Sequence, residues 1–122
     1  MKKILLLTAT VFLFLSACYY DNVEDLYPAG SQSCDTTNVT YSQTIAPIAA
    51  QYCNSCHSGT TPPAGIKTDT YTDLNAIAVN GKLWGVVNHD QGYIPMPYQS
   101  AKLSECNLLK IRKWIDAGSP DN

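Results

Sequence analysis

The sequence has little methionine, little histidine and no excess of basic residues. Its 122 residues include two Met, two His, and eight Lys and Arg against ten Asp and Glu. Binding to nucleic acid calls for a basic stripe or patch, and the sequence shows none. We therefore expect no nucleic-acid partner for this mildly acidic chain.

Strand patterns, internal repeats and low-complexity stretches are also missing from the sequence. Because no run of alternating apolar and polar residues predicts a β-strand, the βαβ setting of thioredoxin-like proteins is not expected. No nucleophile–base pattern and no distal His/Arg pair indicates catalysis. The signals that remain are helical periodicity and the placement of five cysteines.

The longest apolar run, at residues 4–15, follows two lysines and is too short for an ordinary membrane span. Residues 15–18 (LSAC) then resemble a bacterial lipobox, in which the cysteine is acylated and becomes the mature N-terminus. We therefore expect residues 1–17 to be a lipoprotein signal peptide and Cys18 to carry the lipid. The alternative is an ordinary secretory signal, with Cys18 left as a spare thiol.

Residues 18–33 mix Tyr, Asp, Asn, Pro, Gly and Ser without a period, which predicts a flexible tether before a folded domain at 34–122. The residue after Cys18 is Tyr19, not the Asp associated with retention at the inner membrane. We expect an exported protein, anchored through its lipid at the periplasmic face of the outer membrane. Acidic residues within 21–25 resemble a surface-export signal of some bacteria, so the cell surface is the alternative location.

The domain at 34–122 is expected to be all-α, with about four short helices. The first is predicted at residues 42–52, where apolar residues lie at i, i+3, i+4 and i+7. Further helices are predicted at residues 70–79, 83–88 and 104–117. A serine is expected to cap the last of them, and an Asn-Gly pair ends the second.

The most specific motif is Cys53-Asn54-Ser55-Cys56-His57. The pattern C-x-x-C-H is typical of c-type haem attachment. Each thiol can form a thioether to a vinyl group of one haem, and the imidazole can bind its iron. If the segment is one turn of helix, these three side chains share a face. The alternatives are a redox-active C-x-x-C pair, or half of a zinc site that lacks its second pair of ligands.

Met96 is the leading candidate for the sixth ligand of such an iron. It lies 39 residues after His57, between two prolines, in a loop predicted at residues 90–101. The prolines restrict the backbone, so the loop can present one side chain rigidly. A thioether ligand favours ferrous iron and raises the reduction potential. His89 is the alternative sixth ligand, and an open sixth position is the third possibility.

The loop at residues 58–68 is expected to place a backbone carbonyl, near Pro62 or Pro63, against the far ring nitrogen of His57. The alternative for this loop is an ordinary surface turn. Trp84 is expected to be a packing aromatic with a satisfied N–H, and a contact with the haem edge is the alternative.

Cys34 and Cys106 are left to pair with each other, and export permits a disulfide between them. This bridge would close a loop of about 70 residues and reinforce a domain whose own apolar core is small. The alternative is two unpaired buried thiols.

Together these features resemble the small single-haem cytochrome c domains of class I type that occur in bacterial lipoproteins. The segments that carry the resemblance are the C-x-x-C-H motif, Ile45-Ala46-Pro47-Ile48, Pro95-Met96-Pro97 and Lys113-Trp114-Ile115-Asp116-Ala117-Gly118. The resemblance implies an all-α fold around one covalent haem c, with the first and last helices crossing. It implies that His57 and Met96 are axial iron ligands, and that Cys53 and Cys56 are the thioether sites. The short interval before Met96 and the additional cysteine pair depart from the mitochondrial pattern.

The function expected on this basis is transfer of single electrons between a donor and an acceptor redox protein. An iron with both axial positions filled offers no open position to a substrate, so no enzymatic activity is expected. If Met96 is not a ligand, the alternative is a haem sensor or a peroxidase-like enzyme. A third possibility is a structural or thiol-redox lipoprotein without haem.

Overall fold

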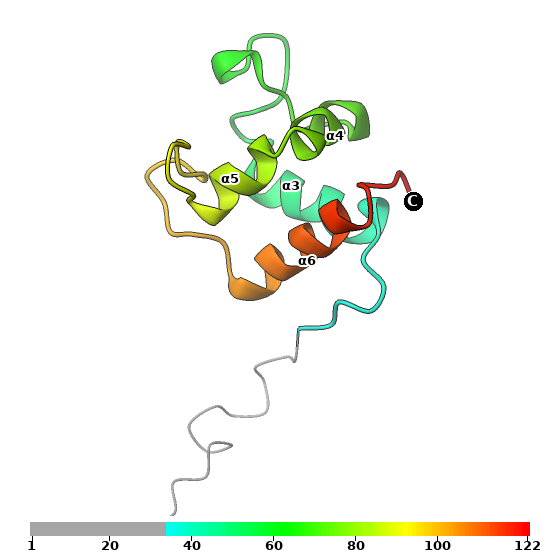
Figure 1. The fold of residues 1–122 in the computed structure, drawn as a ribbon. Coiled ribbons are helices and arrows are strands. Elements are labelled where there is room, and N and C mark those ends of the chain that lie inside the picture. The colour runs from blue at the N-terminus through cyan, green and yellow to red at the C-terminus, as the bar shows by residue number, and fades with distance from the viewer. Residues whose placement is uncertain (1–33) are drawn as a thin grey trace, which may run out of the picture. The chain divides into compact units, whose positions relative to one another are not determined.

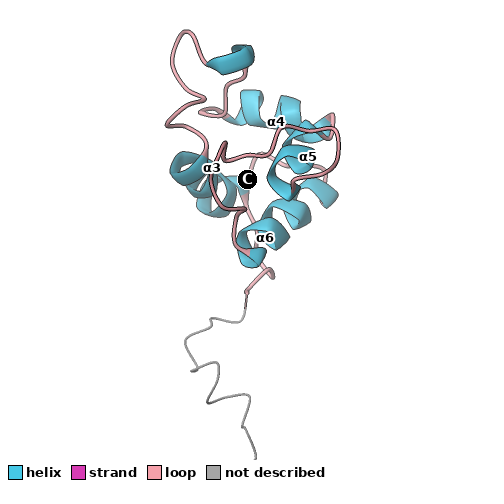
Figure 2. Cartoon of the chain, turned by 90° about the vertical axis from the view of Figure 1, so that its left-hand side faces the viewer, coloured by secondary structure: helices cyan, strands magenta, loops and turns pink. Residues whose placement is uncertain are grey.

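Helices account for all the regular structure of residues 34–122, the part of the chain that the computed structural model describes. In chain order the elements are η1 (Tyr41–Ile45, a π-helical turn), α3 (Ala46–Tyr52), η2 (Pro63–Gly65, a short 3₁₀ turn), α4 (Tyr71–Val79), α5 (Lys82–Asn88) and α6 (Glu105–Asp116). Figure 2 shows helices and loops, and no strand, in this part of the chain. The prediction of an all-α fold is confirmed. The segments predicted to be a signal peptide and a tether, and the expected lipidation at Cys18, lie outside the described residues.

The helix boundaries follow from local signals in the sequence. The hydroxyls of Thr70 and Ser104 accept hydrogen bonds from the backbone N–H groups of Asp73 and Asn107, at 3.2 and 3.3 Å. These side chains cap α4 and α6, as expected for the serine. The first predicted helix is instead divided into η1 and α3. Pro47 takes the second position of α3, in the first turn where proline is tolerated.

The helices surround one apolar core. α6 packs against η1 and α5, and α4 packs against α5 (Figure 1). Ile45, Leu74 and Trp114 are each at most 2% exposed, and burial of such a side chain contributes roughly 1.5–3 kcal/mol. The contact between η1 and α6 joins the first and last helical elements of the described domain. Within residues 34–122, no helix has the length and apolar character needed to cross a membrane.

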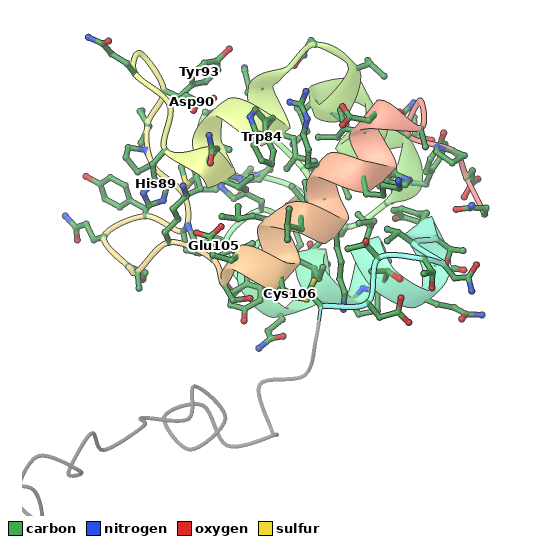
Figure 3. All side chains as sticks on the ribbon, turned by 60° about the horizontal axis from the view of Figure 1, so that its bottom comes forward. Trp84, His89, Asp90, Tyr93, Glu105 and Cys106 are labelled. Carbon is green, nitrogen blue, oxygen red and sulfur yellow. A yellow bond between two sulfur atoms is a disulfide. The ribbon has the colours of Figure 1, made fainter. Side chains whose placement is uncertain are left out.

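The two ends of the described domain are tied to each other. The N–H groups of Tyr41 and Ser42 donate to the side-chain and backbone oxygens of Asn122, each at 2.8 Å. The sulfurs of Cys34 and Cys106 lie at bonding distance, with their Cα atoms 5.3 Å apart, as the predicted disulfide requires. Because Cys106 lies in the first turn of α6 (Figure 3), this bridge fixes the start of the domain to its last helix.

Candidate functional site

An apolar pocket opens between the end of α3, the loop that follows it, α5 and the loop that follows α5. It contains about 480 Å³ of space, part of it open to solvent. The lining residues are Cys53, His57, Ile66, Thr68, Ile77, Lys82, Leu83, Val86, Val87 and Met96. Lys82 is the one residue among them that is a Lys, Arg, Asp or Glu. The exposed wall is almost entirely carbon, so the pocket suits a largely apolar ligand.

This pocket borders the core of the domain. A second apolar space of about 270 Å³ shares Cys53, Leu83 and Val87 with it. The other walls of this space are buried or nearly buried core side chains: Ile45, Ile48, Ala49, Leu74, Leu103 and Ile111. A group held in the pocket would therefore rest directly on the core that α3, α4, α5 and α6 form.

Three of the site residues predicted from the sequence line this pocket together: Cys53, His57 and Met96. Met96 lies 39 positions after His57, and the chain between them includes helices α4 and α5, yet both residues line the same pocket. Two other predicted residues are not among the lining residues. Cys56 is exposed, and His89 contacts the backbone of Met96.

The C-x-x-C-H motif forms a single turn beyond the end of α3 and does not extend the regular helix. The N–H groups of Cys56 and His57 both bond to the carbonyl of Cys53, at 3.1 and 2.9 Å. Because the i→i+3 bond at Cys56 is tighter than an α-helical bond, the segment leaves the α-helical phase. Cys53 and His57 line the pocket together, whereas Cys56 is exposed and is not among the lining residues.

Asn54, inside the motif, and Thr68, at the end of the following loop, hold this turn in place. The N–H of Thr68 donates to the carbonyl of His57 at 2.9 Å. With its amide nitrogen turned toward the carbonyl oxygens of Ala49 and Thr68, Asn54 donates to them at 3.2 and 3.1 Å. Thr68 is only 5% exposed. No pattern in the sequence indicated this pair, because the two residues are 14 positions apart and neither belongs to a periodic segment.

His57 is oriented by a backbone carbonyl, as expected, but by a different one. Its Nδ1 lies 3.0 Å from the carbonyl oxygen of Ile66. The carbonyl can only accept, so Nδ1 carries the proton and a neutral ring has its lone pair on Nε2. The prediction named Pro62 or Pro63. Pro63 begins the exposed turn η2, and the chain returns to the pocket only at Ile66.

The backbone of Met96 is attached to the C-terminal end of α5. Its N–H donates to the carbonyl of Val86 at 2.9 Å, and its carbonyl oxygen lies 3.1 Å from Nε2 of His89. Earlier in the same loop, the ring of Tyr93 packs on Gly85, where a Cβ atom would come within 2.6 Å of three ring atoms. The sequence signal for this contact was a glycine in the middle of a predicted helix.

Trp84 lies on α5 but does not line the pocket. The guanidinium of Arg112, on α6, lies 5.1 Å from the centre of its ring, and also bonds to the Asp116 carboxylate at 3.0 Å. Figure 3 shows Trp84 between α5 and α6. This placement agrees with a packing role for Trp84.

The two motif thiols lie in different surroundings. Burial raises the pKa of Cys53 to about 11 from an ordinary value of 9.0, because the low-dielectric pocket penalises the thiolate. Cys56 is exposed to solvent. Within residues 34–122, no three His, Cys, Asp or Glu side chains gather in a group that could hold a metal ion.

Comparisons of this chain with protein-family models, with curated proteins and with solved structures found no match.

Proposed function

We propose that this protein is a lipid-anchored, single-haem cytochrome of c type that carries single electrons between two redox proteins. The observation that carries the proposal is the meeting of Cys53, His57 and Met96 in one apolar pocket. The C-x-x-C-H motif alone gives the thiols and one imidazole. The fold brings the side chain of Met96 to the same pocket, and its soft thioether is the second iron ligand that we propose for the carrier.

The residues present fit such a group. Cys53 and Cys56 supply the two thiols for thioether bonds. The hydrogen bond to the Ile66 carbonyl fixes the His57 ring. It leaves the lone pair of Nε2 free to bind iron. A bound haem would supply an iron centre that changes its charge by one electron, with a potential set by its axial ligands and by burial.

The other side chains that line the pocket are mostly apolar. Leu83, Val86 and Val87 of α5 and Ile77 of α4 are the main apolar walls. Apart from His57, the pocket lining contains no His, Asp or Glu that could move a proton to or from a bound substrate. This lining supports electron transfer over peroxidase-like catalysis.

The thiol-redox alternative is disfavoured by the burial of Cys53. A reactive C-x-x-C pair depends on a thiolate, which an electropositive and partly exposed setting stabilises. Burial instead raises the pKa of Cys53 to about 11, so its thiol stays protonated at neutral pH. Such a thiol is a poor nucleophile in disulfide exchange.

Spectroscopy of the holoprotein tests the proposal. The chain is expressed in a cell competent for cytochrome c maturation, and haem is detected by its peroxidase stain on a denaturing gel. We expect a covalent haem with a low-spin ferric spectrum and a thioether charge-transfer band. Met96→Ala should remove that band and give a high-spin ferric haem that binds carbon monoxide once reduced.

Ile94→Ala is the matched control, because Ile94 belongs to the same loop and is 62% exposed. It should leave the spectrum unchanged. A colourless protein with both motif thiols free would contradict the proposal. A native high-spin haem that binds carbon monoxide at once would favour the sensor alternative.

The anchor is tested separately. Cys18→Ser should release the haem-bearing protein from the membrane fraction without changing its spectrum. Retention in the membrane fraction would contradict the lipid anchor and leave the haem proposal intact.

A further inference from the structure

We infer that His89 is a positioning residue for Met96: its Nε2–H donates to the Met96 carbonyl oxygen and holds the thioether in the pocket. The inference rests on the proposed function, since it concerns the sixth ligand of the proposed haem. The sequence left open that His89 is itself an iron ligand, and the inference assigns it a different role.

The contact has the geometry of a hydrogen bond. Nε2 of His89 and the carbonyl oxygen of Met96 are 3.1 Å apart, and the carbonyl can only accept. The ring nitrogen is therefore protonated, and its lone pair is not available to a metal in this arrangement. His89 is also absent from the residues that line the pocket, whereas Met96 is among them.

Together with the Val86 carbonyl, this contact fixes both polar atoms of the Met96 backbone to α5. The Met96 N–H donates to Val86 at 2.9 Å. Val86 also lines the pocket, beside Val87. Two hydrogen bonds therefore hold the backbone of Met96 against the C-terminal end of α5, the helix that forms one wall of the pocket.

The backbone of His89 has a conformation that other residue types adopt more readily than histidine. It follows α5 with φ 60° and ψ 41°, in the left-handed region. Glycine or asparagine is the usual residue at such a helix end. Asparagine would suit the backbone better, but its side chain is too short to take over the histidine contact. The side chain of His89 thus has a use that the backbone position alone does not explain.

Other polar side chains hold the ends of the loop, and they do not bond to the Met96 carbonyl, which accepts from His89. The Asn88 amide donates to the carboxylate of Asp90 at 2.7 Å, and Nζ of Lys102 donates to the Asn88 oxygen at 2.9 Å. Figure 3 shows His89, Asp90 and Tyr93 around the loop that follows α5. Loss of the His89 contact should therefore loosen Met96 without unfolding the loop.

The experiment compares His89→Asn and His89→Gln in the holoprotein, with Met96→Ala as the reference for lost ligation. Asn suits the left-handed backbone and removes the contact, while Gln restores a side-chain N–H donor of similar reach. Gln99→Asn is the matched backbone control, since Gln99 has φ 54° and is exposed. The readouts are the thioether charge-transfer band, the rate of carbon monoxide binding to the ferrous protein, and the melting temperature of the haem-free chain.

We expect His89→Asn to weaken the band and to speed carbon monoxide binding about three- to tenfold, the range that loss of one hydrogen bond gives. The melting temperature of the haem-free chain should stay the same or rise. His89→Gln should recover most of the band, and Gln99→Asn should change none of these readouts.

An unchanged band in His89→Asn would overturn the inference, as would failure of His89→Gln to restore a band that His89→Asn had lost. A low-spin spectrum that survives Met96→Ala but not His89→Asn would make His89 itself the ligand, and would overturn the inference while keeping the haem. A wild-type chain without haem would overturn the proposed function, and it would be recognised before any His89 variant is measured.

Discussion

The pocket has two sides that are held in different ways. The His57 side, residues 53–68, is a short turn and loop whose own backbone and side chains bond to one another. The Met96 side, residues 85–97, depends on contacts with α5: the Val86 carbonyl, the His89 ring and the Gly85 surface under Tyr93. The His57 side is held by contacts between residues close in sequence. The Met96 side is held by contacts with α5, which must already be in place.

This difference predicts how each side fails. A covalent thioether would keep a haem on the His57 side even when that side is perturbed. On the Met96 side the only expected bond to iron is reversible, so small changes there should open the sixth position while the haem remains attached. The four changes below separate these two behaviours.

The largest effect is expected from the scaffold that both sides share. Cys34→Ser removes a bridge between residues that are 72 positions apart, and should destabilise the domain by about 2–4 kcal/mol. Thermal or denaturant unfolding measures this loss. Haem attachment and the thioether band should both persist, because neither cysteine lies at the pocket.

Cys106→Ser should give the same loss, and the double variant should add little to it. If Cys34→Ser also abolishes the thioether band, the contacts with α5 are not sufficient to hold Met96, and the disulfide is needed as well.

The buried thiol of Cys53 should make the haem-free chain sensitive to alkali. Its folded pKa of about 11 lies above the ordinary value of 9.0, so the unfolded chain loses this proton first. The contribution of the protonated Cys53 thiol to the free energy of unfolding is fully present below pH 9. It is lost as the pH rises toward 11, by up to roughly 3 kcal/mol. Urea unfolding of the haem-free chain at several pH values measures the slope.

Cys53→Ala should reduce this slope and Cys56→Ser should not. Burial also raises the pKa of Tyr41, which adds a slope common to all these variants, so the difference between variants is the quantity to compare. A thioether cannot titrate, and the contribution of Cys53 should vanish in the holoprotein. An equal slope in Cys53→Ala would contradict the burial of this thiol.

Gly85→Ala should break the Met96 side alone. The new methyl group would lie 2.6 Å from the Tyr93 ring, which must then leave α5. Such overpacking costs about 1–3 kcal/mol, partly offset by about 1 kcal/mol from the better helix propensity of alanine. The thioether band should weaken while haem stays attached, as absorption spectra and a haem-stained gel would show.

The same substitution in a Tyr93→Ala background should be stabilising, because the clash is gone and the helix propensity remains. If Gly85→Ala lowers the melting temperature equally in both backgrounds, the Tyr93 contact is not the cause.

The sequence was sufficient for the features that depend on neighbouring residues. The C-x-x-C-H motif, the cap at Ser104 and the four helices are local patterns. The structure has the cap and the last three helices close to their predicted residues, and it divides the first between η1 and α3. The disulfide pair followed from export and from counting cysteines, and the structure places these two sulfurs together.

The features that depend on how the chain returns on itself were not available from the sequence. Ile66, rather than Pro62 or Pro63, meets His57, because the prolines form an exposed turn before the chain comes back to the pocket. Cys56 is exposed, whereas Cys53 of the same motif lines the pocket. Neither detail has a periodic or compositional signal.

The smallest effect is expected from Thr68→Val on the His57 side. Valine keeps the shape of the apolar wall but removes the hydroxyl that lies 2.8 Å from the Asn54 amide, which should cost about 1 kcal/mol. Thr68→Ser, which keeps the hydroxyl, is the matched control. Haem attachment and the thioether band should be unchanged in both variants, because the Met96 side is held from α5. If Thr68→Val weakens that band as much as Gly85→Ala does, the two sides of the pocket are coupled and the contrast between them is wrong.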